Sequence, residues 1–182
     1  MKYFLETDRL ILRILSEEDA PLTTRFYQDN WMYLAQWEPN VTAEVATLPY
    51  QQQLLRYETQ EREAGRHLRY WYAKKDDPDH LCGSVCFQNI QYTPQCCCQI
   101  GYKQDQHQSG HGYAAEAAEE AVRHLIQDGG FRQITAMVEP HNQPSLRLLA
   151  RLGFRPDDVI PSYAYLRGAW QTCERWILTA NK

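Results

Sequence analysis

A segment near the middle of the chain has the composition of an anion-binding loop. It covers residues 108–114, with glycine at positions 110 and 112, and lies between an expected strand and an expected helix. Glycine permits backbone conformations closed to other residues, so successive N–H groups can point at one anion. The positive end of the helix dipole adds to the attraction. We expect the loop to hold a phosphate group without a basic side chain, although a plain tight turn has the same residues.

Two common phosphate-binding motifs do not fit this segment. A Walker loop requires Gly-Lys-Ser/Thr, which is absent. A dinucleotide-binding fingerprint requires a third glycine, where this chain has Ala115, and a parallel βαβ unit. The strands expected before the loop are antiparallel instead. The loop therefore indicates an anion site of another class.

The six cysteines do not form a pattern typical of a metal site or of a disulfide framework. Cys96, Cys97 and Cys98 are consecutive, and neighbours on a strand point to opposite faces. Cys82 and Cys86 share a strand face but lack zinc-ligand spacing. We expect free thiols in a reducing compartment and no metal.

The elements that must position the loop predict a mixed α/β domain. Ala114, Ala117 and Ala121 recur at helical spacing and indicate one buried helix face. Asn142 stands where a helix N-cap is expected, with Pro144 in the first turn. The expected strands are residues 5–14, 67–74, 81–90, 96–103, 134–139, 163–166 and 172–178, and the expected helices are residues 17–28, 44–64, 113–128 and 143–152.

Length and charge exclude several classes of protein. The 182 residues fit a single domain, 1–182. The net charge of −4 argues against a protein that binds the nucleic-acid backbone. The first apolar run, from Leu10 to Leu12, is flanked by Arg9 and Arg13 and is too short for an export signal or a membrane span. We expect a cytoplasmic protein that binds neither nucleic acid nor membrane.

Four ordered segments carry a resemblance to a known family. They are Ile100-Gly101-Tyr102, the loop with Gly110 and Gly112, Asn142-Gln143-Pro144-Ser145, and Leu152-Gly153-Phe154. In order and spacing they resemble the GNAT superfamily of acetyl-CoA-dependent N-acetyltransferases. The chain is most similar to the ribosomal-protein-alanine N-acetyltransferases of the RimJ/RimL type, and the resemblance covers nearly the whole length.

The resemblance implies a fold and a place for acetyl-CoA. The fold is the GNAT acyl-CoA N-acyltransferase fold: an α/β (α+β) domain whose mixed, mostly antiparallel sheet is splayed open and flanked by helices. The pantetheine arm would pair with the strand near residues 99–102, and the loop would bind the pyrophosphate. The implied cofactor-binding residues are Ile100, Gly101, Tyr102, Gln108, Ser109, Gly110, His111, Gly112, Tyr113, Ala114, Asn142, Ser145 and Arg151.

The resemblance also implies direct attack of a primary amine on the thioester, in a ternary complex. Many family members carry a tyrosine as general acid where this chain has Leu149, and Ser145 is the implied stand-in. The general base is open between Glu38 and Asp157, with His111 a weaker candidate. We expect Trp37 and Trp170 to lie nearest the acceptor.

Several alternatives remain for the acceptor and the activity. The amine belongs either to a protein N-terminus, such as an alanine or serine, or to a small molecule such as a polyamine, an antibiotic or an amino acid. A non-catalytic acyl-CoA-binding module is the alternative from another class, since the usual tyrosine is missing. We expect a monomer or a homodimer.

Overall fold

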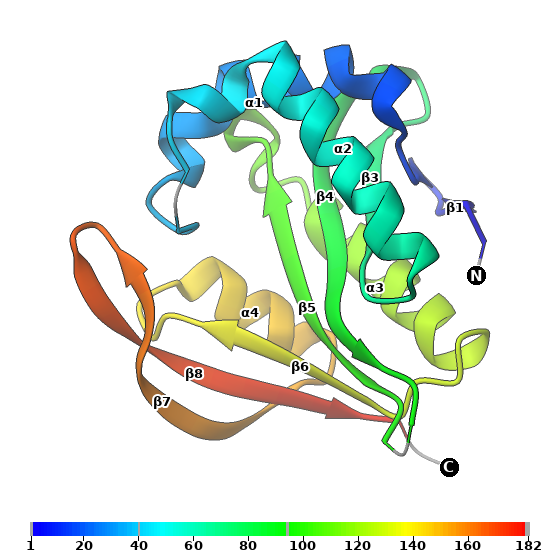
Figure 1. Ribbon diagram of the computed structural model, residues 1–182. Helices are drawn as coiled ribbons and strands as arrows, with labels where there is room; N and C mark the ends of the chain where they lie inside the picture. Colours follow the sequence, from blue (N-terminus) through cyan, green and yellow to red (C-terminus); the bar gives the residue numbers. More distant parts are fainter. Residues whose placement is uncertain (1, 40, 94, 181–182) are drawn as a thin grey trace.

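The computed structural model describes residues 2–39, 41–93 and 95–180 and contains one open eight-stranded sheet in the order β1-β2-β3-β4-β5-β6-β8-β7 (Figure 1). The strands are β1 (Phe4–Glu6), β2 (Leu10–Arg13), β3 (Leu68–Lys74), β4 (Asp77–Gln91), β5 (Cys97–Gln104), β6 (Gln133–Val138), β7 (Arg155–Leu166) and β8 (Ala169–Thr179). The helices are α1 (Ala20–Leu34), α2 (Leu48–Glu63), α3 (Tyr113–Gln127) and α4 (Gln143–Arg151), with 3-10 turns η1 (Glu17–Asp19), η2 (Ala43–Ala46) and η3 (Gln106–Gln108). This confirms the mixed α/β class.

The sheet opens between β5 and β6. These two strands are parallel, whereas the other neighbouring strands are antiparallel. The pairing of β5 with β6 runs from Cys97 opposite Gln133 to Ile100 opposite Ala136. Beyond that point β5 continues to Gln104 paired with β4 alone, and β6 continues paired with β8. Figure 1 shows the ends of the two strands pointing apart. The predicted splay is therefore confirmed.

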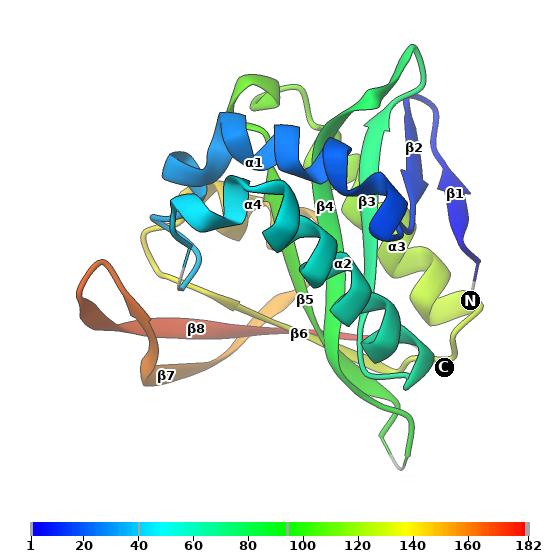
Figure 2. The same cartoon turned by 45° about the horizontal axis from the view of Figure 1, so that its top comes forward.

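Helices cover both faces of the sheet. α1 and α2 lie over β3 and β4 on one face, and α3 and α4 lie on the other (Figure 2). The small side chains of α3, including the fully buried Ala117 and Ala121, let the helix approach the strands closely. A second apolar cluster gathers around Trp71 beneath α1 and α2. No helix in the described part of the chain is long and apolar enough to cross a membrane.

Two segments differ from the strands expected from the sequence. Residues 5–14 form a hairpin rather than one strand, because Thr7 turns the chain. Its Oγ1 accepts a hydrogen bond from the Leu10 amide at 2.9 Å, and its own amide donates to the Leu10 carbonyl at 3.0 Å. β7 begins at Arg155, well before the expected position 163. Its largely exposed side chains show no alternation by which the sequence could reveal a strand.

The helix boundaries also differ in detail. α1 continues to Leu34, six residues beyond the expected end. The expected helix 44–64 is divided at Thr47, whose extended backbone separates η2 from α2. α3 ends at Gln127, one residue before the expected end at position 128.

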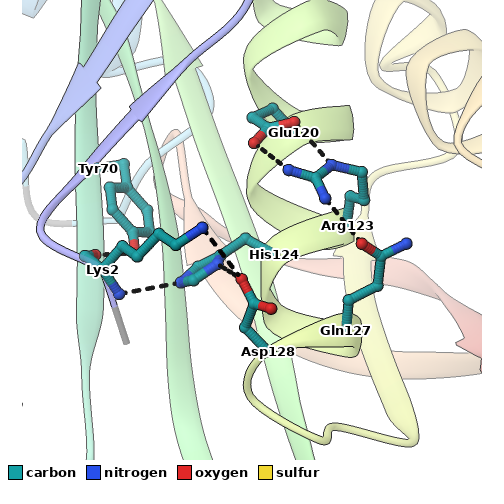
Figure 3. A network of polar contacts seen from close by, with 7 residues as sticks. All are labelled: Lys2, Tyr70, Glu120, Arg123, His124, Gln127 and Asp128. Atoms are coloured by element: carbon teal, nitrogen blue, oxygen red, sulfur yellow. Dashed lines mark hydrogen bonds and ion pairs between the residues drawn. The ribbon is translucent and has the colours of Figure 1, made fainter.

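A buried histidine fastens the start of the chain to the end of α3 (Figure 3). The Lys2 amide donates to His124 Nε2 at 3.1 Å, and Tyr70 Oη donates to the Lys2 carbonyl at 2.7 Å. Because Nε2 accepts, Nδ1 carries the hydrogen and donates to Asp128 at 2.7 Å. This bond lowers the pKa of Asp128. The contacts hold the first strand against the helix that begins with the glycine loop.

Candidate active site

The glycine loop has the backbone geometry of an anion-binding site. Gly110 and Gly112 have φ angles of +84° and +78°, in the left-handed region that favours glycine, and Gly112 caps α3. Among the described residues, none accepts a hydrogen bond from the backbone N–H groups of Gly110 through Ala115. The first amide of the helix to be bonded is that of Glu116, which donates to the Gly112 carbonyl at 3.1 Å. These six successive backbone N–H groups, at the positive end of α3, are therefore available to bind an anion.

Arg9, which the sequence analysis considered only as a flanking charge, lies beside this loop. Its guanidinium lies 4.7 Å from the ring centroid of Tyr113, and its Nη1 donates to the His111 carbonyl at 3.1 Å. Its Nε donates to Glu116 at 2.7 Å. The turn between β1 and β2 brings Arg9 across more than 100 residues of sequence, so no local spacing reveals it. It places a positive charge at the rim of the loop.

The amino end of α4 faces β5 at the place where the sheet opens. The Asn142 side chain accepts the Ser145 amide at 3.3 Å, which confirms the predicted N-cap. Tyr102 Oη on β5 donates to the Ser145 carbonyl at 3.3 Å. Burial raises the pKa of Tyr102 to about 12, so this hydroxyl keeps its proton near neutral pH. β5 and the start of α4 are thereby brought together as the resemblance implied.

Two further positions limit the chemistry available there. A Cβ added at Gly101 would lie 3.1 Å from Cys86 Sγ, so the backbone packs closely at the opening. Leu149, at the position where many family members carry a tyrosine, is fully buried in the core. It offers no proton donor.

Glu38 lies on the segment after α1 and is paired with a buried lysine. Lys103 Nζ lies 2.7 Å from Glu38 Oε2 and donates to Tyr27 Oη at 2.6 Å. Burial lowers the pKa of Lys103. The charge of Glu38 and the nearby Tyr27 act in the opposite direction and together outweigh burial, so the pKa of Lys103 is raised overall. The lysine stays charged at neutral pH, so Glu38 is in contact with a buried cation.

Asp157 lies on β7, between Pro156 and Asp158. Arg175 Nε on β8 is 2.6 Å from its Oδ2. β7 is the outermost strand, two positions from β6, which corresponds to about 10 Å. The structure therefore places Asp157 two strand positions away from β6, the strand that leads to the start of α4, and binds it in an ion pair.

A cluster that the sequence analysis missed joins three segments at the open end of the sheet. We call it the Glu139 cluster; it consists of Glu139, His141 and Arg167. Glu139 follows β6 and is only 5% exposed, and Arg167, in the turn between β7 and β8, pairs with its carboxylate. Arg167 also donates to the Gln36 carbonyl. His141 Nε2 lies 2.9 Å from Glu139 Oε2.

This cluster brings together the two segments that carry the predicted acceptor residues. The Trp37 ring lies 6.4 Å from the ring of His141, tilted by 40°. Trp170 is 63% exposed on the β7–β8 hairpin and packs edge-on against Tyr165 at 5.6 Å. Because Arg167 ties that hairpin to the segment with Trp37, both tryptophan-bearing segments flank the same end of the sheet.

The cysteines provide no evident nucleophile or metal site. All six are free, as predicted, and burial raises the pKa of Cys98 to about 12. A thiol of that pKa is protonated at neutral pH. In the described ranges, no three side chains of histidine, cysteine, aspartate or glutamate gather as a metal site would require.

Comparison with known proteins agrees with this geometry. The sequence pattern of the family described as "Acetyltransferase (GNAT) domain" matches residues 9–155. The chain belongs to the GNAT acetyltransferase family. The [ribosomal protein uS5]-alanine N-acetyltransferase of Escherichia coli (strain K12) is 30% identical over 170 residues, which cover 93% of this GNAT chain and 87% of the relative. This GNAT protein is thus an acetyl-CoA-dependent N-acetyltransferase, and the binding-module alternative is not favoured.

Solved structures show the same fold. The ribosomal-protein-S5-alanine acetyltransferase from Vibrio fischeri has a TM-score of 0.92 at 22% identity and covers 100% of this chain and 98% of its own. RimJ from Mycobacterium smegmatis, solved in complex with CoA-disulfide, has a TM-score of 0.87 at 24% identity and covers 94% of this chain and 82% of its own. The GNAT fold expected from the sequence is confirmed.

Proposed function

We propose that this GNAT enzyme transfers the acetyl group of acetyl-CoA to the α-amine of a protein N-terminus, with a ribosomal protein as the type of acceptor. One observation carries the proposal. After Ile100, β5 is no longer paired with β6, and this point lies opposite the amino end of α4 and next to the glycine loop. The relative from Escherichia coli, named for acting on alanine of ribosomal protein uS5, supports this type of acceptor.

The cofactor would lie along the edge of β5 that β6 leaves free. Its pantetheine arm would pair with the backbone from Ile100 to Tyr102, in the manner of an added strand. Its pyrophosphate would take the free amides of the glycine loop, with Gln108 and Ser109 at the entrance. Asn142 would bond the amides of the arm. Arg151, exposed in the last turn of α4, would reach the phosphates of the nucleotide.

The acceptor would enter from the end of the sheet where Trp37 and the hairpin with Trp170 lie. A protein N-terminus suits this end because it is an extended chain whose aliphatic and aromatic parts can pack on Trp37 and on the exposed Trp170. Its ammonium group would be attracted by the nearby carboxylate of Glu38. A small amine remains the alternative acceptor.

Transfer would proceed by direct attack on the thioester. The amine lone pair forms the C–N bond, the C–S bond breaks, and a backbone amide of β5 near Gly101 stabilises the oxyanion. Ser145 would pass a proton to the leaving thiolate. The family resemblance leaves Glu38 and Asp157 as carboxylate candidates for the proton acceptor. Since each is held by a cation, a water molecule would carry the proton to them.

A peptide panel tests the acceptor. Peptides with a free N-terminal alanine, serine or another residue, and a set of small amines, are incubated with acetyl-CoA, and CoA release and product mass are followed. The proposal expects acetylation of the α-amine of an alanine or serine peptide. A peptide with a blocked N-terminus is the matched control. Turnover on small amines alone would contradict the proposal.

A further inference from the structure

His141 is a solvent-exposed histidine with a buried carboxylate behind it. Its side chain is 61% exposed, whereas the side chain of Glu139, at 2.9 Å, is 5% exposed. It directly precedes Asn142, the cap of the helix that carries Ser145. The imidazole thus stands at the open end of the sheet, between the aromatic ring of Trp37 and the start of α4.

The pairing fixes which ring nitrogen is free. An ionised carboxylate only accepts hydrogen bonds, so a neutral His141 presents its hydrogen on Nε2 toward Glu139 and keeps the lone pair on Nδ1. Arg167 donates to both carboxylate oxygens of Glu139. When Nδ1 takes a proton, the resulting positive charge lies next to the buried carboxylate, which stabilises it.

The other candidate bases are less suited to direct proton transfer. Glu38 is paired with Lys103 at 2.7 Å, and Asp157 with Arg175 at 2.6 Å. Each carboxylate must therefore leave an ion pair before it can take a proton directly. His141 is instead in contact with an anion, and histidine changes its charge near neutral pH.

We propose that His141, oriented by Glu139, is the general base that takes the proton from the ammonium group of the acceptor. This inference rests on the transfer to an amine proposed above. Nδ1 accepts one proton from the ammonium and releases it to water. The freed lone pair forms the C–N bond with the thioester carbon, and the C–S bond breaks with its electron pair on sulfur. The second proton leaves nitrogen and reaches the thiolate through the Ser145 hydroxyl.

Titratable groups from several elements face His141 or its partner Glu139. Glu139 faces it from the end of β6, and Arg167 reaches Glu139 from the hairpin turn. The buried Cys173 of β8 lies close enough for Glu139 to raise the pKa of its thiol, although burial is the larger cause. Glu38 adjoins Trp37 on the segment after α1. Substitutions of Glu139 and Glu38 therefore test which of the two carboxylates acts on His141.

The kinetic test compares pH profiles of His141→Gln and the wild type. At pH 7 we expect kcat for peptide acetylation to fall about 100-fold, with the KM for acetyl-CoA unchanged. The deficit should shrink above pH 9, because an α-amine with a pKa of about 8 then loses its proton unaided. Free imidazole should restore part of the rate of His141→Ala. A residue with a merely structural role would show neither effect.

Two further variants sharpen the result. His80→Gln is the matched control, since His80 also lies near a buried carboxylate, 3.4 Å from Asp105, and its rate should equal that of the wild type. Glu139→Gln should lower kcat at pH 7 with the KM for acetyl-CoA unchanged, because a carboxylate no longer orients the ring of His141. Wild-type rates for His141→Gln across the pH range would overturn the proposal, as would a loss equal at pH 7 and pH 9. A loss of kcat in Glu38→Gln with none in Glu139→Gln would overturn it too.

A spectroscopic measurement separates this inference from the acceptor proposal. The ring nitrogens of the neutral His141 are observed by NMR in the wild type, with no acceptor present. We expect the hydrogen on Nε2, toward Glu139, and the lone pair on Nδ1. A hydrogen on Nδ1 would overturn the role of Glu139 whatever the acceptor, whereas failure of the wild type to acetylate any peptide, with the hydrogen on Nε2 as expected, would contradict only the peptide acceptor.

Discussion

Replacement of Gly112 by valine should weaken acetyl-CoA binding without destroying the fold. Gly112 caps α3 with a φ of +78°, a conformation that costs an ordinary L-residue about 1–2 kcal/mol and a β-branched one more. A Cβ there would meet only Arg9 Nη2, at an ordinary 3.7 Å. The penalty therefore comes from the backbone rather than from a clash, and the loop can relieve it by relaxing.

The relaxed loop no longer presents its amides together, so binding must restore the strained conformation. A cost of about 2 kcal/mol corresponds to a dissociation constant raised about 30-fold. Isothermal titration calorimetry with acetyl-CoA measures this directly. Gly112→Ala carries less strain, so its dissociation constant for acetyl-CoA should lie between those of Gly112→Val and the wild type.

Gly130→Val is the matched control for this experiment. Gly130 has a φ of +70° and open space around its added Cβ, but it lies beyond the other end of α3. The Gly130→Val variant should lose about as much stability in thermal unfolding as Gly112→Val and keep the wild-type affinity for acetyl-CoA. An affinity of Gly112→Val within twofold of the wild type would refute the role assigned to the loop.

Two other changes test the site and its support. Ser145→Ala should lower kcat about 100-fold while leaving the acetyl-CoA dissociation constant nearly unchanged; an undisturbed rate would exclude Ser145 as the proton donor. Burial raises the pKa of Glu116, but hydrogen bonds from Thr7 and Arg9 outweigh it and lower the pKa overall, so its stabilising effect is present at neutral pH and lost as pH falls through the lowered pKa. Urea unfolding should therefore show the wild type losing about 1 kcal/mol more stability than Glu116→Gln between pH 6 and pH 3; equal losses would contradict the argument.

Features encoded over a few residues could be predicted from the sequence. The left-handed glycines at 110 and 112 and the Asn142 cap depend on local backbone geometry, and the structure has them as expected. The alanine stripe of α3 and the opening of the sheet after Ile100 also follow, the first from periodicity and the second from the family resemblance.

Features that depend on distant segments could not be predicted. Arg9 meets the glycine loop across more than 100 residues, and Arg167 meets Glu139 across 28. No spacing rule connects such positions, because the sheet order alone decides that they are neighbours. Asp157 illustrates the converse: its acidic, proline-containing surroundings suggest a turn, but pairing of β7 with β8 makes the segment a strand.

The most direct test of the account is hydrogen–deuterium exchange with and without acetyl-CoA. If the cofactor occupies the opening between β5 and β6, two segments should become protected when it binds: Gly101 to Gln104 on the free edge of β5, and Gly110 to Ala115 at the start of α3. Tight binding of acetyl-CoA with no change in exchange at either segment would contradict the central claim.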